Sequence, residues 1–293
     1  MAALLLATLA LAQDPILRLD VRLIRVLTTV RDASGSLLGT LNKEDFSILD
    51  NGAPQSISIF ERRTEQPLSV ALLVDTSGST AKDLKYEVDS VARFLNALFT
   101  GGNPEDSVAL FSFNYQVTKH SGFIRNQHTL EARLRTLRGE AGTALYDAIY
   151  LAASELDRRP GRRVMLIVTD GGDTFSAKDY HAALNAAQLA DAVIYPVLVV
   201  PIAGDAGRNI GGEHALATLA GGTGGRVFEP TLGSALDAAF SDILKELRTQ
   251  YLLAYYPHET PLTKNHFHNL EVRVNRPGLH VLSRNGYYGE SIQ

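Results

Sequence analysis

The stretch "LLVDTSGST" (residues 72–80) joins an apolar run directly to a carboxylate and a series of hydroxyl groups. Residues 72–74 have the composition of a buried strand, and Asp75 stands where that strand ends. Ser77 and Ser79 follow at the second and fourth positions after it. Open parallel sheets bind ligands beyond the carboxyl ends of their strands, so this pattern indicates one part of a ligand site.

The chain around this stretch alternates apolar strands with helical patterns. Strands that are apolar on both faces and alternate with helices are typical of a mostly parallel sheet covered on both sides. We therefore predict a doubly wound α/β domain over residues 68–248. The predicted strands are 69–75, 107–113, 163–169 and 192–199, and the predicted helices are 81–98, 128–137, 144–157, 178–190, 212–220 and 233–248.

Both flanks of this domain have the shorter alternation of antiparallel β-structure. In "FSILDNGAPQSISIF" (46–60) two alternating runs surround Asn51-Gly52, which is a strong hairpin signal. The tail contains three further runs with strand character, "YLLAYYP" (251–257), "HNLEVRVNR" (268–276) and "HVLSR" (280–284).

Neither flank makes a comfortable domain alone, since cores are marginal below about 50 residues. Together they give about seven strands and about 90 residues, the size of an immunoglobulin-like sandwich. We predict one antiparallel immunoglobulin-like β-sandwich into which the α/β domain is inserted. The predicted divisions are 1–12 (a signal peptide), 13–67 and 249–293 (the two halves of the sandwich) and 68–248 (the α/β domain). The inward sandwich residues are predicted to include Val21, Ile48, Ile59, Leu253 and Val272.

A second carboxylate and a threonine extend the ligand pattern. The strand "VMLIVTD" ends at Asp170, and Thr143 begins a predicted helix after a loop that contains glycine. If the two strands are neighbours, five side chains converge, and all of them offer oxygen. Such a set suits a hard cation such as Mg²⁺ rather than Zn²⁺ and leaves a position open for water or an incoming carboxylate. The predicted metal ligands are Asp75, Ser77, Ser79, Thr143 and Asp170.

Each of these residues has an ordinary structural explanation when it is taken alone. Asp75 is a common type of helix cap, and Asp170 is a common type of turn residue before two glycines. The occurrence of all five in this order favours the metal site. Asp147 and Asp173 lie close by in the sequence, and for them an indirect role at the ion and simple solvation stay equally open.

The five positions match the D-x-S-x-S…T…D metal-ion-dependent adhesion site of von Willebrand factor A (VWA) domains, with similar surroundings in "TALYDA", "VTDGGD" and "TGGRVF". The resemblance covers roughly residues 68–248. It implies that the serines and the threonine coordinate the ion directly and that the aspartates bind directly or through water. The flanking "DFSILDNGAPQSISIF" and "SRNGYYG" resemble a bacterial VWA-related family described from acidobacterial exported proteins.

Other motifs carry weaker signals. "AGGTGGR" (220–226) follows a predicted helix and precedes a strand, so we interpret it as a turn rather than a phosphate loop. "HETPLTKNHFH" (258–268) is interpreted as a solvated hairpin loop, with a second metal site as the alternative. "DRRPGRR" (157–163) is interpreted as a solvated helix end opposite the metal site, with an anionic partner as the alternative. "VPIAGDAGRNIGGE" (200–213) should rim the metal face and contribute to partner choice.

Composition narrows the function further. The 293 residues carry a net charge of -4, which argues against a nucleic acid or an acidic membrane as partner. There is no cysteine, so disulfides and thiolate sites are excluded. "MAALLLATLALAQD" (1–14) is typical of a signal peptide and predicts export, although no Lys or Arg precedes its apolar run. An upstream start, or a buried strand or helix, is the alternative. No other segment is predicted to span a membrane.

Three functions are compatible with these features. The first is a non-enzymatic, Mg²⁺-dependent protein-binding module, with Mn²⁺ as the alternative ion, in which a partner's Asp or Glu completes the coordination. The second is a structural subunit of a larger exported assembly, in which the metal stiffens the loops. The third is a metal-assisted hydrolase, which is disfavoured because no His lies near the predicted ligands in sequence and no G-x-S-x-G occurs.

Overall fold

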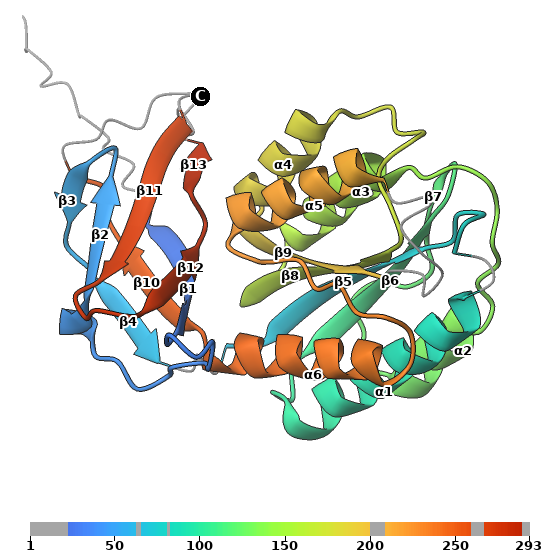
Figure 1. Cartoon of the computed structure of the whole chain (residues 1–293), viewed down its shortest axis with the longest axis horizontal. Coiled ribbons are helices and arrows are strands. Elements are labelled where there is room, and N and C mark those ends of the chain that lie inside the picture. Colours follow the sequence, from blue (N-terminus) through green and yellow to red (C-terminus); the bar gives the residue numbers. More distant parts are fainter. Residues whose placement is uncertain (1–22, 63–65, 81–82, 200–208, 259–266, 289–293) are drawn as a thin grey trace, which may run out of the picture.

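The computed structural model describes residues 23–62, 66–80, 83–199, 209–258 and 267–288. Figure 1 shows two bodies side by side, an all-β body formed by both ends of the described chain and an α/β body formed by its middle. The predicted signal peptide and Val21 lie outside the described residues. No helix in the described ranges combines the length and the apolar character that crossing a bilayer requires.

The α/β body is organised around one five-stranded sheet. Its strand order is β7-β6-β5-β8-β9, and β5 pairs in parallel with both β6 and β8. Every residue of β5 is buried, which accounts for its apolar sequence on both faces. The four predicted strands are confirmed, whereas the antiparallel edge strand β7 was not predicted. The strands are β5 (Leu68–Asp75), β6 (Ser107–Phe113), β7 (Val117–Lys119), β8 (Arg162–Thr169) and β9 (Ala192–Leu198).

Helices cover both faces of this sheet, as the sequence predicted. On one face α1, α2 and α6 pack against residues such as Val70 and Leu72, and on the other α3, α4 and α5 pack against residues such as Ala71 and Leu73 (Figure 1). The helices are α1 (Leu84–Gly101), α2 (Gln127–Leu134), α3 (Leu145–Leu156), α4 (Tyr180–Leu189), α5 (Ile210–Thr223) and α6 (Ser234–Thr249).

The strand order places β5 at the point where the direction of winding reverses. The chain moves from β5 to β6 on one side, and later strands add on the other side through β8. Val74 lies opposite Val168 in the parallel register, so Asp75 and Asp170 leave the same edge of the sheet from adjacent strands. This is the kind of position at which open α/β sheets bind ligands.

The all-β body consists of two four-stranded antiparallel sheets, and each sheet contains strands from both ends of the described chain. Their orders are β12-β1-β10-β4 and β13-β11-β2-β3. The strands are β1 (Ile24–Arg31), β2 (Phe46–Asp50), β3 (Ala53–Gln55), β4 (Ile59–Arg62), β10 (Tyr251–Tyr255), β11 (Phe267–Val274), β12 (His280–Ser283) and β13 (Gly286–Tyr288), with a short 3-10 helix at Lys43–Asp45.

The predicted hairpin is confirmed. Asn51 and Gly52 both have positive φ, at 49° and 82°, which is the geometry of the two-residue turn that joins β2 to β3. Ile48, Leu253 and Val272 share one buried core, so both ends of the described chain contribute to it. The immunoglobulin-like character of this sandwich and the exact domain limits stay predictions.

One inward residue was assigned wrongly. Ile59 is 37% exposed, whereas Ile57 is buried and Phe60 packs against the core. The alternation changes phase because residues 56–58 leave the regular strand between β3 and β4. A single run of alternating letters therefore does not fix which face each residue takes.

Candidate metal-binding site

Asp75 is fully buried at the carboxyl end of β5 and is oriented by two hydrogen bonds. Its Oδ2 accepts from the hydroxyl of Thr169 at 2.6 Å, and its Oδ1 accepts from the backbone N–H of Ser77 at 2.8 Å. Burial raises the pKa of the Asp75 carboxyl to about 6, although both hydrogen bonds act in the opposite direction. The two hydrogen bonds thus fix the position of the Asp75 carboxylate, but both come from neutral groups and do not balance its negative charge.

Three further predicted ligands connect the loop after β5 to the end of the neighbouring strand β8. The hydroxyl oxygens of Ser77 and Ser79 are 3.0 Å apart, and Ser79 Oγ donates to Asp170 Oδ1 at 3.1 Å. Ser77 is buried, whereas Ser79 is exposed and Asp170 is half-buried. One end of the oxygen cluster is therefore accessible from solvent.

Thr143 lies in an adjacent loop. Its carbonyl accepts from the N–H groups of Thr174 and Phe175 at 2.9 and 3.1 Å, and the N–H of Glu140 in the same loop donates to Thr76 at 2.8 Å. Among the described residues, Thr143 makes no hydrogen bond to the other four predicted ligands. The structure thus joins Asp75, Ser77, Ser79 and Asp170 by direct contact and places Thr143 in a loop fixed beside them.

Asp147 and Asp173, whose roles the sequence left open, bind backbone and hydroxyl groups of neighbouring segments. Asp147 accepts from the N–H groups of Ala177 and Lys178 at 3.0 and 2.8 Å. Asp173 accepts from the N–H of Tyr146 at 3.2 Å and from the hydroxyl of Ser176. Both carboxylates therefore brace the first turn of α3 against the loop that follows β8.

Glu87 on α1 is a component of this region that the sequence analysis missed. It is 1% exposed, and its Oε2 has no hydrogen-bond partner among the described residues. Burial raises its pKa to about 8, and the charges of Asp75 and Asp170 raise it further. The sequence contains a signal for this burial, because the helical spacing of Leu84, Glu87 and Val88 places Glu87 on the apolar face of α1.

The acidic groups at this edge do not form a closed cage. No cluster of three or more His, Asp or Glu side chains arranged as metal ligands occurs in the part of the chain that the structure describes. An ion here would rest on two carboxylates, hydroxyl groups and water. That donor set fits Mg²⁺, which is usually held by one or two carboxylates and keeps several waters.

The segment 200–213 lies outside the described residues except at its end. Residues 210–213 begin α5, and Gly212 packs against Gly172 so closely that a Cβ on Gly212 would lie 2.4 Å from Gly172 Cα. The start of α5 therefore contacts the loop that carries Asp170. Its contribution to partner choice stays a prediction.

The structure describes residues 220–226 and part of residues 258–268. The interpretation of "AGGTGGR" as a turn holds only for its end, since residues 220–223 belong to α5 and Gly224 follows the helix with φ of 88°. In "HETPLTKNHFH", residues 259–266 lie outside the described part of the chain. His268 was wrongly assigned to a solvated loop, since it is 2% exposed on β11 and lies 3.0 Å from Asp50.

The interpretation of "DRRPGRR" as solvated is also wrong for part of the motif. Arg158 is exposed, but Arg162 is buried and donates to the carbonyl of Leu247. Arg159 donates to Ser69 and Ser107 at 3.2 and 3.1 Å. This burial depends on the packing of the β-sandwich and α6 against this end of the sheet, which no local pattern in the segment indicates.

Comparison with known proteins identifies the fold of the α/β body. A family model described as the von Willebrand factor type A domain matches residues 70–172. The α/β body has a VWA fold. No curated protein matches this chain.

Three solved structures illustrate the similarity. The PilB minor pilin from Streptococcus sanguinis is 14% identical with a TM-score of 0.50, over 64% of this chain and 63% of that one. The pilus adhesin SpaC from Lactobacillus rhamnosus GG is 10% identical with a TM-score of 0.52, over 85% of this chain and 48% of that one. The vWF domain of the pilus tip protein Mfa5 from Porphyromonas gingivalis is 16% identical with a TM-score of 0.48, over 61% and 94%. At these identities, the likenesses to PilB and SpaC show the fold alone.

Proposed function

We propose that the VWA body is a divalent-cation-dependent protein-binding module and has no catalytic activity. The observation that carries the proposal is the run of hydrogen bonds that links Asp75 to Ser77 through a backbone N–H and then continues through the hydroxyls of Ser77 and Ser79 to Asp170. It runs from a buried carboxylate to a solvent-accessible one at the point where β5 and β8 leave the sheet. A cation there would be held by the protein on one side and open to a partner on the other.

The unpartnered Glu87 carboxyl supports the presence of a cation. A buried carboxyl that faces Asp75 and Asp170 without a hydrogen-bond partner for Oε2 is costly unless a positive charge or a proton compensates. Mg²⁺ between the two aspartates would supply that charge. The residues that would hold it are Asp75, Ser77, Ser79, Thr143 and Asp170, with Mn²⁺ as the alternative ion.

The bound ion would supply a point of attachment for a carboxylate. Since Mg²⁺ requires six oxygen ligands, a site with few protein anions leaves positions that an Asp or Glu of a partner protein can take. Specificity would then come from the loops around the ion, including the start of α5. The appearance of this fold in a minor pilin and a pilus adhesin agrees with an interaction role.

A hydrolytic function is less well supported by the same residues. Metal-assisted hydrolysis by a general base needs a group that is free to take a proton from water. Asp147 and Asp173, the aspartates nearest in sequence to Thr143 and Asp170, instead accept hydrogen bonds that brace α3. We accordingly propose an exported binding protein, with export resting on the signal peptide predicted from residues 1–12.

A crosslinking capture experiment tests this function. Purified chain is incubated with exported proteins of its source in Mg²⁺ or in EDTA, and the captured proteins are compared by mass spectrometry. Ser79→Ala removes a ligand at the exposed end of the site, and Ser154→Ala removes an exposed hydroxyl on α3 as the matched control. The proposal requires specific partners that wild type and Ser154→Ala capture only in Mg²⁺ and that Ser79→Ala loses. Identical partners in EDTA would contradict it.

A further inference from the structure

A pocket of about 40 Å³ lies where the sandwich meets the VWA body, at the opposite end of the sheet from the candidate metal site. The sandwich contributes residues of β1 and β10, and the VWA body contributes the beginnings of β8 and β9 and the ends of α4 and α5. Leu27, Val193 and Leu252 form apolar walls. A space of this size admits a few waters or one small ion, since a water needs roughly 10–15 Å³.

Four arginines line this pocket together with a single carboxylate, that of Asp191. Asp191 is already paired with Arg284 at 2.6 Å. The Arg25 guanidinium donates one hydrogen bond within the described residues, to the neutral Gln66 at 2.5 Å. In the part of the chain that the structure describes, the Arg163 guanidinium pairs with Asp157, which is 64% exposed and 3.7 Å away. Positive charge therefore exceeds negative charge among the residues that line the pocket.

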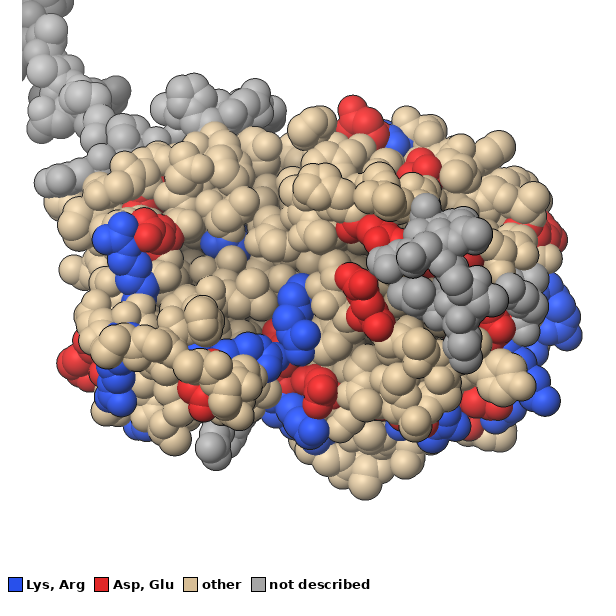
Figure 2. Space-filling model, viewed as in Figure 1, with Lys and Arg blue, Asp and Glu red and all other residues tan. Residues whose placement is uncertain are grey.

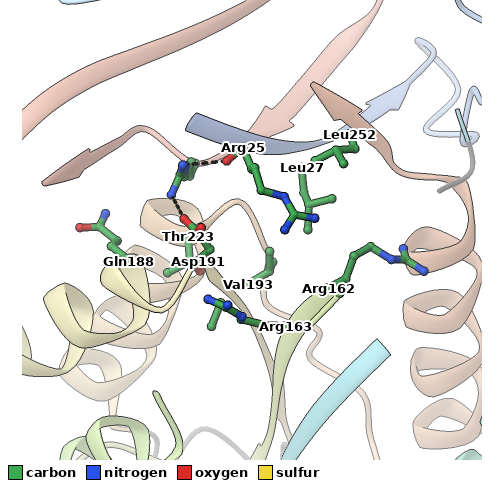
Figure 3. Close-up of a pocket in the computed structure, with 12 residues that line it drawn as sticks. Arg25, Leu27, Arg162, Arg163, Gln188, Asp191, Val193, Thr223 and Leu252 are labelled. Carbon is green, nitrogen blue, oxygen red and sulfur yellow. Dashed lines mark hydrogen bonds and ion pairs between the residues drawn. The ribbon is translucent and has the colours of Figure 1, made fainter. Parts of the chain in front are cut away.

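The arginines differ in their direction and in the hydrogen bonds that they already donate to other protein groups. Figure 3 shows Arg25 extending from β1 toward β8, whereas Arg162 points away toward α6, where it donates to Leu247. Arg163 donates to the carbonyls of Arg159 and Ala190, each at 2.8 Å. Among the described residues, these hydrogen bonds leave Arg163 Nη2 unused, and the direction of Arg162 sets it apart. We therefore assign Arg25, Arg163 and Arg284 as the groups that would bind a ligand.

Arg284 provides a second observation that points to a ligand. The residue is 7% exposed, and its Nη1 and Nη2 donate to Asp191 and to the Arg25 carbonyl. Its Nε is buried and has no hydrogen-bond partner among the described residues. An unsatisfied buried donor on a charged group is uncommon in a folded protein, and a bound acceptor would satisfy it.

We propose that this pocket binds a small, multiply charged oxyanion of the phosphate class. Guanidinium groups match the geometry of phosphate oxygens and bind them with charge-assisted hydrogen bonds. The apolar walls would strengthen these bonds by excluding water. Because Arg25 belongs to the sandwich and Arg163 to the VWA body, the anion would also fasten the two bodies together.

Inorganic phosphate is the probe for this site. It is titrated into the full chain by calorimetry in metal-free buffer, with sodium chloride adjusted to keep the ionic strength constant. Metal-free conditions separate this test from the proposed metal-dependent function. We expect saturable binding at one site per chain and a rise in the thermal midpoint that follows the same saturation curve.

Variants locate the site within the chain. Arg25→Gln and Arg163→Gln should each weaken phosphate binding at least about tenfold, as expected for the loss of a charge-assisted hydrogen bond. Arg158→Gln removes the same charge from an exposed residue of the same segment and should leave binding unchanged. Absence of saturable binding by the wild-type chain, or equal affinity in wild type and Arg25→Gln, would overturn the proposal.

Discussion

Ser79 Oγ donates a hydrogen bond to Asp170 Oδ1 across 3.1 Å, although 91 residues separate the two in the sequence. The contact exists because β5 and β8 are neighbouring parallel strands whose carboxyl ends meet at one edge of the sheet. It places an exposed hydroxyl and a half-buried carboxylate next to the buried Asp75.

Thr169 is expected to tune the metal site without being a ligand. Thr169→Val keeps the side-chain shape but removes the donor to Asp75 Oδ2. Since that hydrogen bond lowers the pKa of Asp75, its loss should raise this pKa further and weaken Mg²⁺ binding about tenfold near neutral pH. Calorimetric titrations at pH 6.5 and pH 8 should show the larger defect at pH 6.5. An equal defect at both pH values would contradict the expectation, and Thr100→Val on α1 serves as the control.

Glu87 is expected to make the metal-free protein less stable as pH rises. Its pKa in the folded state is raised from 4.5 to about 8, so its stabilising contribution is complete below pH 4.5 and is lost as pH rises through about 8. The slope is at most ~1.4 kcal/mol per pH unit. Urea unfolding in EDTA between pH 6 and 8 measures this pH dependence of the unfolding free energy. The range lies above the pKa of Asp75, which is about 6, so the contribution of Asp75 is small there.

Glu87→Gln should flatten this slope, because glutamine does not titrate. Glu105→Gln changes an exposed glutamate just after α1 and should keep the wild-type slope. If wild type and Glu87→Gln lose stability in parallel over this pH range, the buried carboxyl is not the cause.

Glu246 should be the main polar stabiliser of the junction. It is fully buried on α6 and accepts from Arg31 of β1 at 2.5 Å, from Arg226 at 3.0 Å and from Tyr195 Oη at 3.0 Å. Figure 2 shows Lys and Arg side chains along the seam between the two bodies on this face. Glu246→Ala leaves the guanidinium groups without their anion and should cost about 3–5 kcal/mol of unfolding free energy.

Asp242→Ala provides the matched control for Glu246. Asp242 lies on the same helix and pairs with Lys245 at 3.1 Å, but it is 54% exposed. Exposed pairs contribute about 0–1 kcal/mol, so chemical denaturation should separate the two variants clearly. Equal losses would show that the buried cluster does not hold the junction.

Removal of the chain after Arg248 should affect the sandwich and spare the VWA body. β10 lies between β1 and β4 in its sheet, so a fragment of residues 13–248 lacks the strand to which both are paired. We expect this fragment to aggregate or to lose hydrogen-exchange protection in β1. A fragment of residues 68–248 should stay soluble and bind metal. Unchanged protection of β1 in the longer fragment would refute the inserted-domain prediction.

Local patterns were enough to predict the α/β fold and the two loops that carry most of the candidate site. Buried parallel strands such as β5 are apolar throughout, and Asn51-Gly52 satisfies the backbone demands of its turn. These features depend on residues close together in the sequence. The metal ligands could be proposed because each follows or precedes a recognisable element.

Features that depend on distant packing were not predictable in the same way. In the sequence Glu87 resembles an ordinary helix glutamate, whereas the structure shows that it lies on the buried face of α1. The ion pair between Arg31 and Glu246 joins residues 215 positions apart. The charged segment at Arg162 is buried by α6 and lies beside the junction of the two bodies, and no periodicity in the sequence indicates either contact.

The central claim is tested most directly by calorimetric titration of Mg²⁺ into the full chain. Wild type should bind one ion per chain. Asp75→Ala should abolish or greatly weaken binding, because it removes one of only two carboxylates in the proposed ligand set. Asp173→Ala should weaken it far less, and Asp157→Ala, an exposed aspartate at the other end of the sheet, should not change it. Equal, wild-type-like affinity in Asp75→Ala, or no binding by the wild-type chain, would contradict the metal site and the binding mechanism that depends on it.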